Sequence, residues 1–377
     1  MAHIHLIGIG GAGLSAIATV LLQQNHIVSG SDMQGSAVTQ RLERQGATVF
    51  IGQQPENLGS DIDVVVVSSA VDSENPELRE AHRRGLRVVK RAEWLGEMMT
   101  GFAGIAIAGT HGKTTTTAMI AFLLKEAGLD PTFIIGGFVS QMDTNAAAGS
   151  GPTFVIEADE YDNMFLGLHP TMAVVTVVEW DHPDIFPSPV ELQQAFEQFV
   201  QLISDDGIVI GCGEAPGVRN VLEAARGTVI TYGVEANNDW QARNLAVNDR
   251  GGFDFIAVST IHRQAAQVSL AVPGQHNVLN ALAALAVGHH QGIELSVAAE
   301  ILGQFRGVER RFQLKGMVKG ITIIDDYAHH PTEIKATLAA ARARYPEESI
   351  WAVFQPHTFS RTWSLLDEFA AAFDDAD

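Results

Sequence analysis

The sequence predicts an α/β protein with three consecutive domains. Three times along the 377 residues, an apolar run ends in a glycine-rich or polar turn that leads into a helical pattern. These runs are His3–Ile9, Gly104–Ala108 and Gly320–Asp325. A strand, a turn and a helix in this order begin a βαβ unit. At about 150 residues per domain, the length allows two to three domains. We expect domains over 1–98, 99–304 and 305–377.

The first block is expected to form a Rossmann-like domain on a parallel sheet. Its strand Asp63–Ser68 contains four consecutive valines, which is typical of a parallel strand buried on both faces. Alternating and helical spacings predict the other elements around it. They are helices over Leu14–Gln24 and Asn75–Arg84, and strands over His26–Ser31 and Leu86–Val89.

The central block continues the α/β pattern and then changes it. Buried strands are expected over Thr153–Ala158, Met172–Val178 and Gly207–Cys212, with helices over Thr115–Ala127 and Asn277–Gln291. Between Trp240 and Val272 the residues alternate around Gly251-Gly252, which predicts an antiparallel hairpin.

The third block holds two strand–helix units. Strands are expected over Gly320–Asp325 and Ser349–Gln355, and helices over Thr332–Tyr345 and from about Ser360 to Phe373. A Rossmann-like domain needs more strands to cover its sheet. We therefore expect this C-terminal domain to be truncated.

Composition excludes several partners. Lys and Arg total 24 against 44 Asp and Glu, a net charge of −20. Such a charge argues against nucleic acid and anionic membranes as partners, although amide groups and a few cations can still hold phosphates locally. Cys212 is the only cysteine, which fits a reducing compartment, and no apolar run approaches the roughly 18 residues of a membrane span. We expect a cytoplasmic protein.

The first glycine-rich turn predicts a nucleotide site. Gly8, Gly10 and Gly13 match G-x-G-x-x-G, with Gly11 between them, and Asp32 follows the next strand. Glycines let a backbone approach a pyrophosphate at a helix N-terminus, and an acid in this place can bind a ribose hydroxyl. The motif does not distinguish NAD from another nucleotide diphosphate, and glycines that serve only tight packing are the alternative.

The second turn, GTHGKTTTT, predicts ATP binding. Its amides can wrap phosphates, Lys113 can reach the β- and γ-phosphates, and the Thr114 hydroxyl can bind Mg²⁺. The alternative is a turn that is merely rich in glycine and threonine. Two phosphate-binding turns in one chain favour an enzyme that uses ATP to activate a nucleotide-bearing substrate. The expected ATP-binding residues of this turn are Gly109, Thr110, His111, Gly112, Lys113, Thr114 and Thr115.

Acidic residues follow the next two buried strands. Glu157 ends one strand, and His182 follows the other within EWDHPD. Strand-end carboxylates beside a phosphate loop are where Mg²⁺ ligands belong, so Thr114, Glu157 and His182 are expected to hold Mg²⁺. A loop imidazole without a ligand role is the alternative for His182. Most of the neighbouring acids are expected to be solvated: Asp159, Glu160, Asp181 and Asp184.

With these motifs in place, the chain resembles the Mur ligase family of peptidoglycan synthesis. The resemblance runs from end to end, through HLIGIGGAG, AGTHGKTTTT, EADEYD, DHPD, PGQHNVLNALAA, FRGVERRF, DDYAHHPTE and FQPHTFSRT. It implies a three-domain ligase that uses ATP to join L-alanine to the lactyl carboxylate of UDP-N-acetylmuramate through an acyl phosphate. It also implies Mg²⁺ as cofactor, and we expect a monomer or weak homodimer.

The resemblance also implies roles for residues of the central and third domains. His276 and Asn280 would reach the adenine, and Arg311 and Asp326 would approach ATP across a domain interface. Lys113, Arg311 and His329 would be catalytic, with His329 as a candidate base for the amine. The residues implied around the amino acid and the muramyl carboxylate are Tyr327, His329, His357 and Arg361.

Two features keep alternatives open. Thr358 stands after His357 where many relatives carry Arg, so Arg361 would have to supply more of the carboxylate grip. EWDHPDIF is similar to the family members that attach a murein tripeptide to the same UDP-sugar. A nucleotide-binding module without ligase activity is the remaining alternative.

Overall fold

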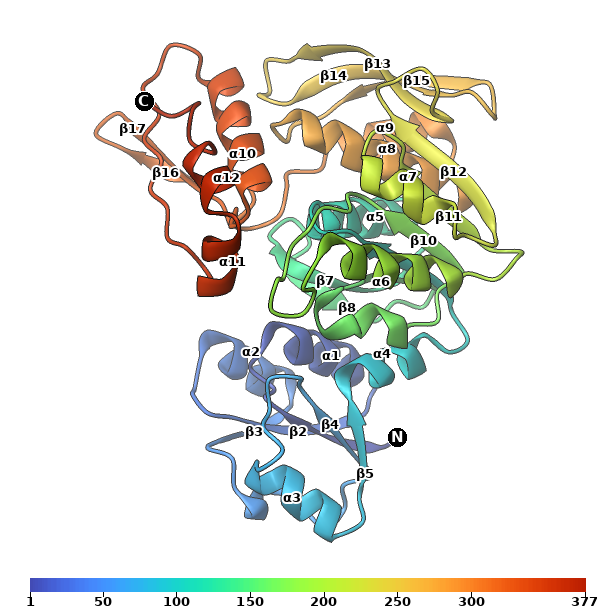
Figure 1. Cartoon of the computed structure of the whole chain (residues 1–377). Coiled ribbons are helices and arrows are strands. Elements are labelled where there is room, and N and C mark those ends of the chain that lie inside the picture. The colour runs from blue at the N-terminus through green and yellow to red at the C-terminus, as the bar shows by residue number, and fades with distance from the viewer.

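The computed structural model describes residues 1–377, except for the side chain of Pro216, and divides into three lobes along the chain (Figure 1). The N-terminal domain is a five-stranded parallel sheet in the order β3-β2-β1-β4-β5. The expected strands and helices are all present. Its elements are β1 (His3–Ile7), α1 (Ala12–Gln23), β2 (Ile27–Asp32), α2 (Ala37–Gln45), β3 (Thr48–Ile51), η1 (Pro55–Asn57), β4 (Val64–Val67), α3 (Pro76–Arg83), β5 (Arg87–Lys90) and α4 (Arg91–Met99).

The strand order of this domain reverses at β1. The chain runs outward from β1 to β2 and β3, then crosses to β4 and β5 on the other side. Ligands of open α/β sheets bind where the order reverses, at the carboxyl ends of the strands. The glycine-rich turn after β1 lies at this point, and the four valines of β4 are buried beside it, as expected.

The central domain is a ten-stranded mixed sheet in the order β15-β14-β13-β12-β11-β10-β6-β9-β7-β8. The expected hairpin is present as three antiparallel strands, β13 to β15, that extend the parallel part. The strands are β6 (Ala103–Ala108), β7 (Thr132–Val139), β8 (Thr144–Ala147), β9 (Thr153–Glu157), β10 (Met172–Val175), β11 (Ile208–Cys212), β12 (Thr228–Gly233), β13 (Trp240–Val247), β14 (Phe253–Ser259) and β15 (Gln264–Ser269).

Helices cover both faces of the central sheet. On one face α5 and α8 pack together with α9, in a core that reaches from Ile105 to Phe305. On the other face α6 and α7 share a core with α1 of the N-terminal domain, so one hydrophobic cluster runs through both domains. The central helices are α5 (Lys113–Glu126), η2 (Tyr161–Gly167), α6 (Pro189–Gln201), α7 (Pro216–Leu222), α8 (Gln275–His290) and α9 (Leu295–Gly303).

The third domain differs from the expectation in two of its elements. The strand expected over Ser349–Gln355 is wrong: the segment is irregular and has no ladder partner among the described residues, and the side chain of Val353 is 98% exposed. The single helix expected after Ser360 is two short helices that meet at Leu365. The elements are β16 (Gln313–Val318) and β17 (Ile321–Asp325), which pair antiparallel, α10 (Pro331–Arg344), α11 (Phe359–Ser364) and α12 (Leu366–Ala370).

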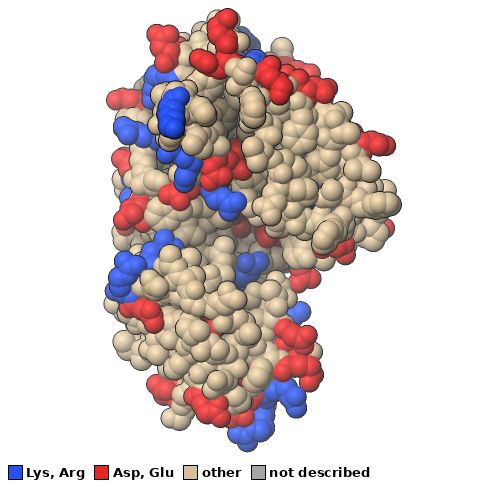
Figure 2. All heavy atoms as spheres, turned by 90° about the vertical axis from the view of Figure 1, so that its left-hand side faces the viewer, with Lys and Arg blue, Asp and Glu red and all other residues tan. Residues whose placement is uncertain are grey.

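The third domain stands beside the central domain near the carboxyl ends of its parallel strands (Figure 1). Its small core, built on Ile334, Leu338 and Phe369, is separate from the other hydrophobic cores and touches the central domain through Trp180. On the face that carries this domain, acidic and basic side chains are interspersed (Figure 2). Across the described part of the chain, no helix has both the length and the apolar character needed to span a membrane.

Candidate active site at the junction of the central and third domains

The turn between β6 and α5 is folded for anion binding. Gly109 has φ +140°, and a Cβ there would lie 2.0 Å from Thr176 Oγ1. Gly112 is the N-cap of α5 with φ +83°. The Thr110 amide donates to Val177 O at 2.8 Å and fastens the turn to the end of β10. The amides that begin α5 are thus held in the arrangement that binds phosphates at helix N-termini.

Lys113 projects from this turn onto a buried carboxylate. Its Nζ donates to Glu160 Oε1 and Oε2 at 2.9 and 2.7 Å, and to Gly109 O at 2.6 Å. Burial alone would lower the pKa of Lys113, but the charges of Glu160 and neighbouring carboxylates outweigh burial and raise it. The amine is therefore a fixed positive charge at the mouth of the turn.

The expectation that Glu160 is solvated is wrong, because its side chain is fully buried. Besides Lys113, it lies 3.7 Å from His182 Nε2. The sequence feature that could have identified Glu160 as part of the site is its position in EADEYD, three residues after Glu157 at the end of the strand. Spacing alone does not separate it from its acidic neighbours.

The residues expected to hold Mg²⁺ surround the same lysine. Thr114 Oγ1 donates to Glu157 Oε1 at 3.0 Å, and Glu157 Oε2 accepts from the Gly136 amide at 2.7 Å. A Cβ at Gly136 would lie 2.5 Å from that carboxylate, so glycine keeps the space around it open. The charge of Lys113 acts on both Glu157 and His182. A hydroxyl and a carboxylate oxygen in contact, with an imidazole nearby, fit a hard divalent cation.

A cavity of about 180 Å³ opens beside the phosphate-binding turn, between the central and third domains. It brings together most of the residues expected to bind ATP, from segments more than 200 positions apart in sequence. Gly109, Thr110 and Lys113 are not part of its lining and lie in the adjoining turn. The expected residues that line the cavity are His111, Gly112, Thr114, Thr115, His276, Asn280, Arg311 and Asp326.

Asn280 and Asp326 of this set make hydrogen bonds that shape the walls of the cavity. Asn280 Oδ1 accepts from Thr116 Oγ1 at 3.0 Å, and a Cβ on Gly112 would lie 3.0 Å from the same oxygen. Asn280 is therefore buried against the phosphate turn. Asp326 accepts from the Phe312 and Ala328 amides, both at 2.7 Å, and so shapes the loop that carries Arg311.

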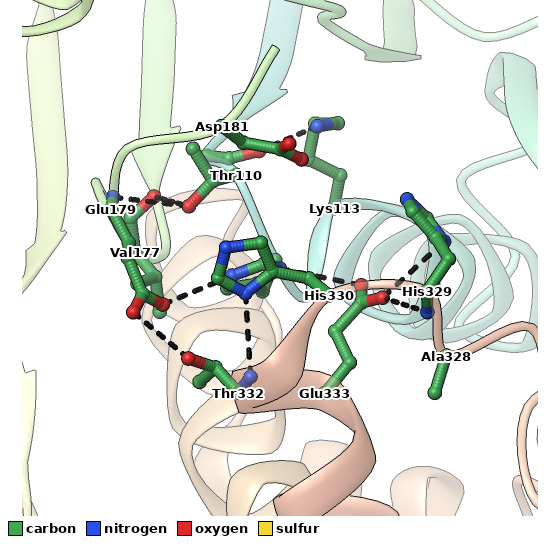
Figure 3. A network of polar contacts seen from close by, with 12 residues as sticks. Thr110, Lys113, Val177, Glu179, Asp181, Ala328, His329, His330, Thr332 and Glu333 are labelled. Atoms are coloured by element: carbon green, nitrogen blue, oxygen red, sulfur yellow. Dashed lines mark hydrogen bonds and ion pairs between the residues drawn. The ribbon is translucent and has the colours of Figure 1, made fainter. Parts of the chain in front are cut away.

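A polar network joins the two domains beside the cavity (Figure 3). Its centre is His111, whose Nε2 lies 3.1 Å from Glu179 Oε2 and whose Nδ1 lies 3.3 Å from Glu333 Oε1. Burial would lower the pKa of His111, but hydrogen bonds to the two carboxylates and their charges raise it to about 9. Thr332 Oγ1 also donates to Glu179 at 2.8 Å, and Arg311 lies 3.7 Å from Glu333. Sequence reasoning missed Glu179 and Glu333, although both stand in the quoted motifs or beside them.

The residues expected around the amino acid divide into two groups. The rings of Tyr327, His329 and His357 cluster at centroid distances of 5.0 to 6.3 Å. Arg361 instead lies in a buried ion pair: its Nε donates to Asp181 Oδ1 at 2.6 Å and its Nη2 to Oδ2 at 3.1 Å. Asp181 is therefore buried, which corrects the expectation that it is solvated. Thr358 accepts from the Arg361 amide at 3.4 Å as the N-cap of α11.

The first glycine turn forms a second site at the end of β1. Gly8 has φ +90°, and the Gly10 amide donates to Asp32 Oδ2 at 2.9 Å. A Cβ on Gly13 would lie 1.9 Å from Arg91 Nη1, so the guanidinium rests directly on the start of α1. Arg91 Nε is buried with no hydrogen-bond partner among the described atoms. Arg91 was missed because it follows β5, 78 positions beyond Gly13 and in no glycine motif.

These features define an α/β enzyme fold with two glycine-rich turns, each between a strand and a helix, in separate domains. Three family models match in chain order: "Mur ligase family, catalytic domain" over residues 3–103, "Mur ligase middle domain" over 107–288, and "Mur ligase, glutamate ligase domain" over 310–377. The chain belongs to the Mur ligase family, with the three-domain architecture expected from the sequence. The third domain is present; its expected truncation stays a prediction.

Two similar proteins from different bacteria carry the same name. UDP-N-acetylmuramate–L-alanine ligases from Salinibacter ruber and Pelobacter propionicus are 46% and 47% identical. The alignments cover 100% and 99% of this chain, and 78% and 81% of the relatives. The crystal structure of UDP-N-acetylmuramate–alanine ligase from Thermotoga maritima matches with a TM-score of 0.85 and 30% identity, covering 100% of this chain and 84% of that one. A murein peptide ligase from Psychrobacter arcticus matches with a TM-score of 0.81 and 27% identity, covering 99% and 88%.

Proposed function

We propose that the chain is an ATP-dependent ligase that joins L-alanine to the lactyl carboxylate of UDP-N-acetylmuramate in peptidoglycan precursor synthesis. The observation that carries the proposal is the convergence of the phosphate turn, Arg311 and Asp326 on one cavity between two domains. The names of the relatives at 46% and 47% identity supply the two substrates.

The reaction proceeds in two steps. A carboxylate oxygen of the muramyl group attacks the γ-phosphorus of ATP, and the bond to the β-phosphate oxygen breaks, giving an acyl phosphate and ADP. The alanine amine then attacks the acyl carbon, and inorganic phosphate leaves as the amide forms. The chain contributes mainly positioning and charge. Lys113 and Arg311 hold the phosphates, and His329 accepts the ammonium proton before attack.

A divalent cation completes the charge balance on the phosphates. Thr114, Glu157 and His182 would hold Mg²⁺, which when bound neutralises charge on the β- and γ-phosphate oxygens. In the chain itself, the amides at the start of α5 bind the phosphates, and Lys113 holds its charge next to Glu160. His276 and Asn280 line the part of the cavity assigned to the adenosine.

The two remaining substrates lie on either side of the nucleotide. The diphosphate of the UDP-sugar is assigned to Gly8, Gly10, Gly11 and Gly13, with Asp32 at the ribose and Arg91 against the phosphates. The amino acid and the muramyl carboxylate are assigned to the rings of Tyr327, His329 and His357, together with Arg361. Arg361 Nη1 is buried and has no partner among the described atoms, so one end of the guanidinium is available to a carboxylate.

The proposal includes three statements about the whole molecule. Domain limits at 1–98, 99–304 and 305–377 assign one substrate to each domain. A cytoplasmic location matches the single cysteine and the nucleotide substrates. A monomer or weak homodimer is expected, and sedimentation over a range of concentrations tests it.

The Lys113→Ala substitution tests the nucleotide site. It removes the charge that faces the phosphates, so ADP release that depends on UDP-N-acetylmuramate and L-alanine is expected to disappear. Lys125→Ala, on the exposed end of the same helix, is the matched control and should keep wild-type turnover. Turnover near wild type in Lys113→Ala contradicts the assignment of the phosphate turn.

The amino-acid assignment is tested with a panel of acceptors. Phosphate release is measured with UDP-N-acetylmuramate, ATP and, in turn, L-alanine, glycine, L-serine and a murein tripeptide. Release with L-alanine supports the proposal. Release with the tripeptide alone selects the tripeptide-adding reaction, and no release with any of the four selects a nucleotide-binding module without ligase activity.

A further inference from the structure

Three potential metal ligands meet at the domain junction, apart from the residues assigned to Mg²⁺. His111 comes from the phosphate turn, Glu179 from the segment after β10, and His330 from the third domain, where it precedes α10. One ligand atom from each of the three lies within 4.8 Å of the others. Figure 3 shows Thr332 bonded across the junction to the side chain of Glu179, with His330 bonded to Thr332 beside them.

The His330 ring is buried without a full set of partners. Its residue is 2% exposed, and its Nε2 has no hydrogen-bond partner among the described atoms. Its Nδ1 accepts only a long bond, 3.3 Å, from the Thr332 amide. A buried polar atom left unpaired is costly, and a metal ion on either ring nitrogen would sacrifice at most that one long bond. The ring also lies against His111, with centroids 4.6 Å apart.

The groups around the cluster already hold it in the manner of a metal site. Metal-bound imidazoles usually donate their second nitrogen to a carboxylate, and metal-bound carboxylates are themselves hydrogen-bonded. His111 Nε2 faces Glu179, and its Nδ1 lies 3.3 Å from Glu333 Oε1. Glu179 Oε1 accepts from Thr332 Oγ1 at 2.8 Å. Without a metal, a proton on His111 bridges it to Glu179.

We propose that His111, Glu179 and His330 form a binding site for a transition-metal ion such as Zn²⁺, which links the central and third domains. Two imidazoles and one carboxylate suit Zn²⁺, Co²⁺ or Ni²⁺ and are a poor set for Mg²⁺, which prefers oxygen ligands. The site thus differs from the proposed Mg²⁺ site, where Thr114 and Glu157 offer two oxygens beside the single imidazole of His182. The cavity that His111, Thr332 and Glu333 line provides the path of entry. Binding displaces the proton from His111 to solvent.

Co²⁺ is the probe for the test, because its visible absorption reports imidazole coordination. The full chain is stripped of metals and titrated with CoCl₂ in excess MgCl₂, without nucleotide, and ZnCl₂ is then added as a competitor. One Co²⁺ per chain is expected, displaced by Zn²⁺. Glu179→Gln and His330→Gln, each of which keeps a polar side chain of similar size, should weaken Co²⁺ binding at least tenfold, with unchanged far-ultraviolet circular dichroism.

Two control variants locate the ion independently. His289→Ala alters a second histidine cluster, in which the His262 and His289 rings lie 3.9 Å apart, and Glu157→Gln alters the proposed Mg²⁺ site. Both should bind Co²⁺ like the wild type. Loss of binding in either control, or wild-type binding in both Glu179→Gln and His330→Gln, overturns the proposal. X-ray absorption of the Zn²⁺-loaded wild type needs no variant: two imidazole ligands support the site, and none overturns it.

Discussion

Lys113 and Glu160 form a buried ion pair in which Nζ donates to both carboxylate oxygens, at 2.9 and 2.7 Å. The pair lies at the start of α5, where the phosphates of a nucleotide are proposed to bind. Because a phosphate would approach the same ammonium, Glu160 acts as the counter-charge while the nucleotide is absent. Phosphate and Glu160 therefore compete for one lysine.

The Glu160→Gln substitution should separate stability from nucleotide binding. Loss of the carboxylate leaves a largely buried ammonium whose remaining hydrogen-bond partners are neutral, which should lower the free energy of unfolding by about 3 kcal/mol. ATP supplies the missing negative charge, so it should bind more tightly to the variant and restore part of the loss. Thermal melting with and without ATP measures both effects. Asp162→Asn, at an exposed position nearby, should change neither, and an equal loss with and without ATP would contradict the competition.

Arg91 should contribute to the binding of UDP-N-acetylmuramate and have no effect on the binding of ATP. Its guanidinium rests on the start of α1, and a charged hydrogen bond to a phosphate contributes about 1.5–3 kcal/mol. Arg91→Ala should therefore raise the KM for UDP-N-acetylmuramate by roughly tenfold or more, with the KM for ATP unchanged. Steady-state kinetics with each substrate varied in turn provide the measurement. Arg83→Ala, in the same domain with a side chain 72% exposed, is the control, and a parallel rise in both KM values would refute the assignment.

The ion pair between Arg361 and Asp181 should hold the third domain in place. Arg361→Lys keeps the charge but loses the two-point contact with the carboxylate, at a cost of about 2 kcal/mol. Backbone amides of α11 should then exchange hydrogen for deuterium faster, while those of α1 stay unchanged. Arg342→Lys affects a half-exposed ion pair within the third domain and should have little effect. Unchanged exchange in α11 after Arg361→Lys would show that the pair does not fasten the domain.

The ionisation of Glu77 should make the free energy of unfolding depend on pH in the acid range. Burial of its carboxylate would raise the pKa, but the His5 ring, whose Nε2 lies 3.5 Å away, and hydrogen bonds from the Ser31 and Asn57 side chains lower the pKa below its usual value. A carboxyl whose pKa is lower in the folded state stabilises the fold above its unfolded pKa of about 4.3. That contribution is lost as the pH falls through the lowered folded value. The difference in stability between wild type and Glu77→Gln should thus be constant above about pH 5 and shrink below it.

Urea unfolding between pH 3 and 7 measures this difference for Glu77→Gln. Glu74→Gln, with a side chain 78% exposed just before the same helix, is the control and should follow the wild type throughout. A difference that grows on acidification would have the wrong sign for the proposed hydrogen bonds.

Sequence patterns predicted the fold well wherever a single strand or turn determines the outcome. The four valines of β4 indicate a doubly buried strand, and the two glycine turns follow their strands as expected. Ser349–Gln355 shows the limit of this reasoning. Its apolar residues satisfy a strand pattern, but a strand exists only if another one lies alongside it, and local sequence carries no record of that neighbour.

Sequence motifs predicted most of the residues at the site, but they did not predict which carboxylates form ion pairs there. Most of the residues expected to bind ATP line one cavity because each lies in a turn whose sequence is distinctive. The acidic partners Glu160, Asp181 and Glu333 were not found in these roles, because whether a carboxylate is solvated or paired depends on the distant residue that faces it. Asp181 meets Arg361 across 180 positions, a separation that no local pattern spans.

The way in which the hydrophobic clusters are divided among the domains determines the order in which the domains unfold. A single hydrophobic cluster passes through the N-terminal and central domains, whereas the third domain beyond Arg310 is attached through Trp180 and a few charged or polar pairs. Urea and heat should therefore melt the first two domains as one cooperative unit. Because little apolar surface joins it to the central domain, the third domain should separate at a lower urea concentration or temperature than the one at which that unit unfolds.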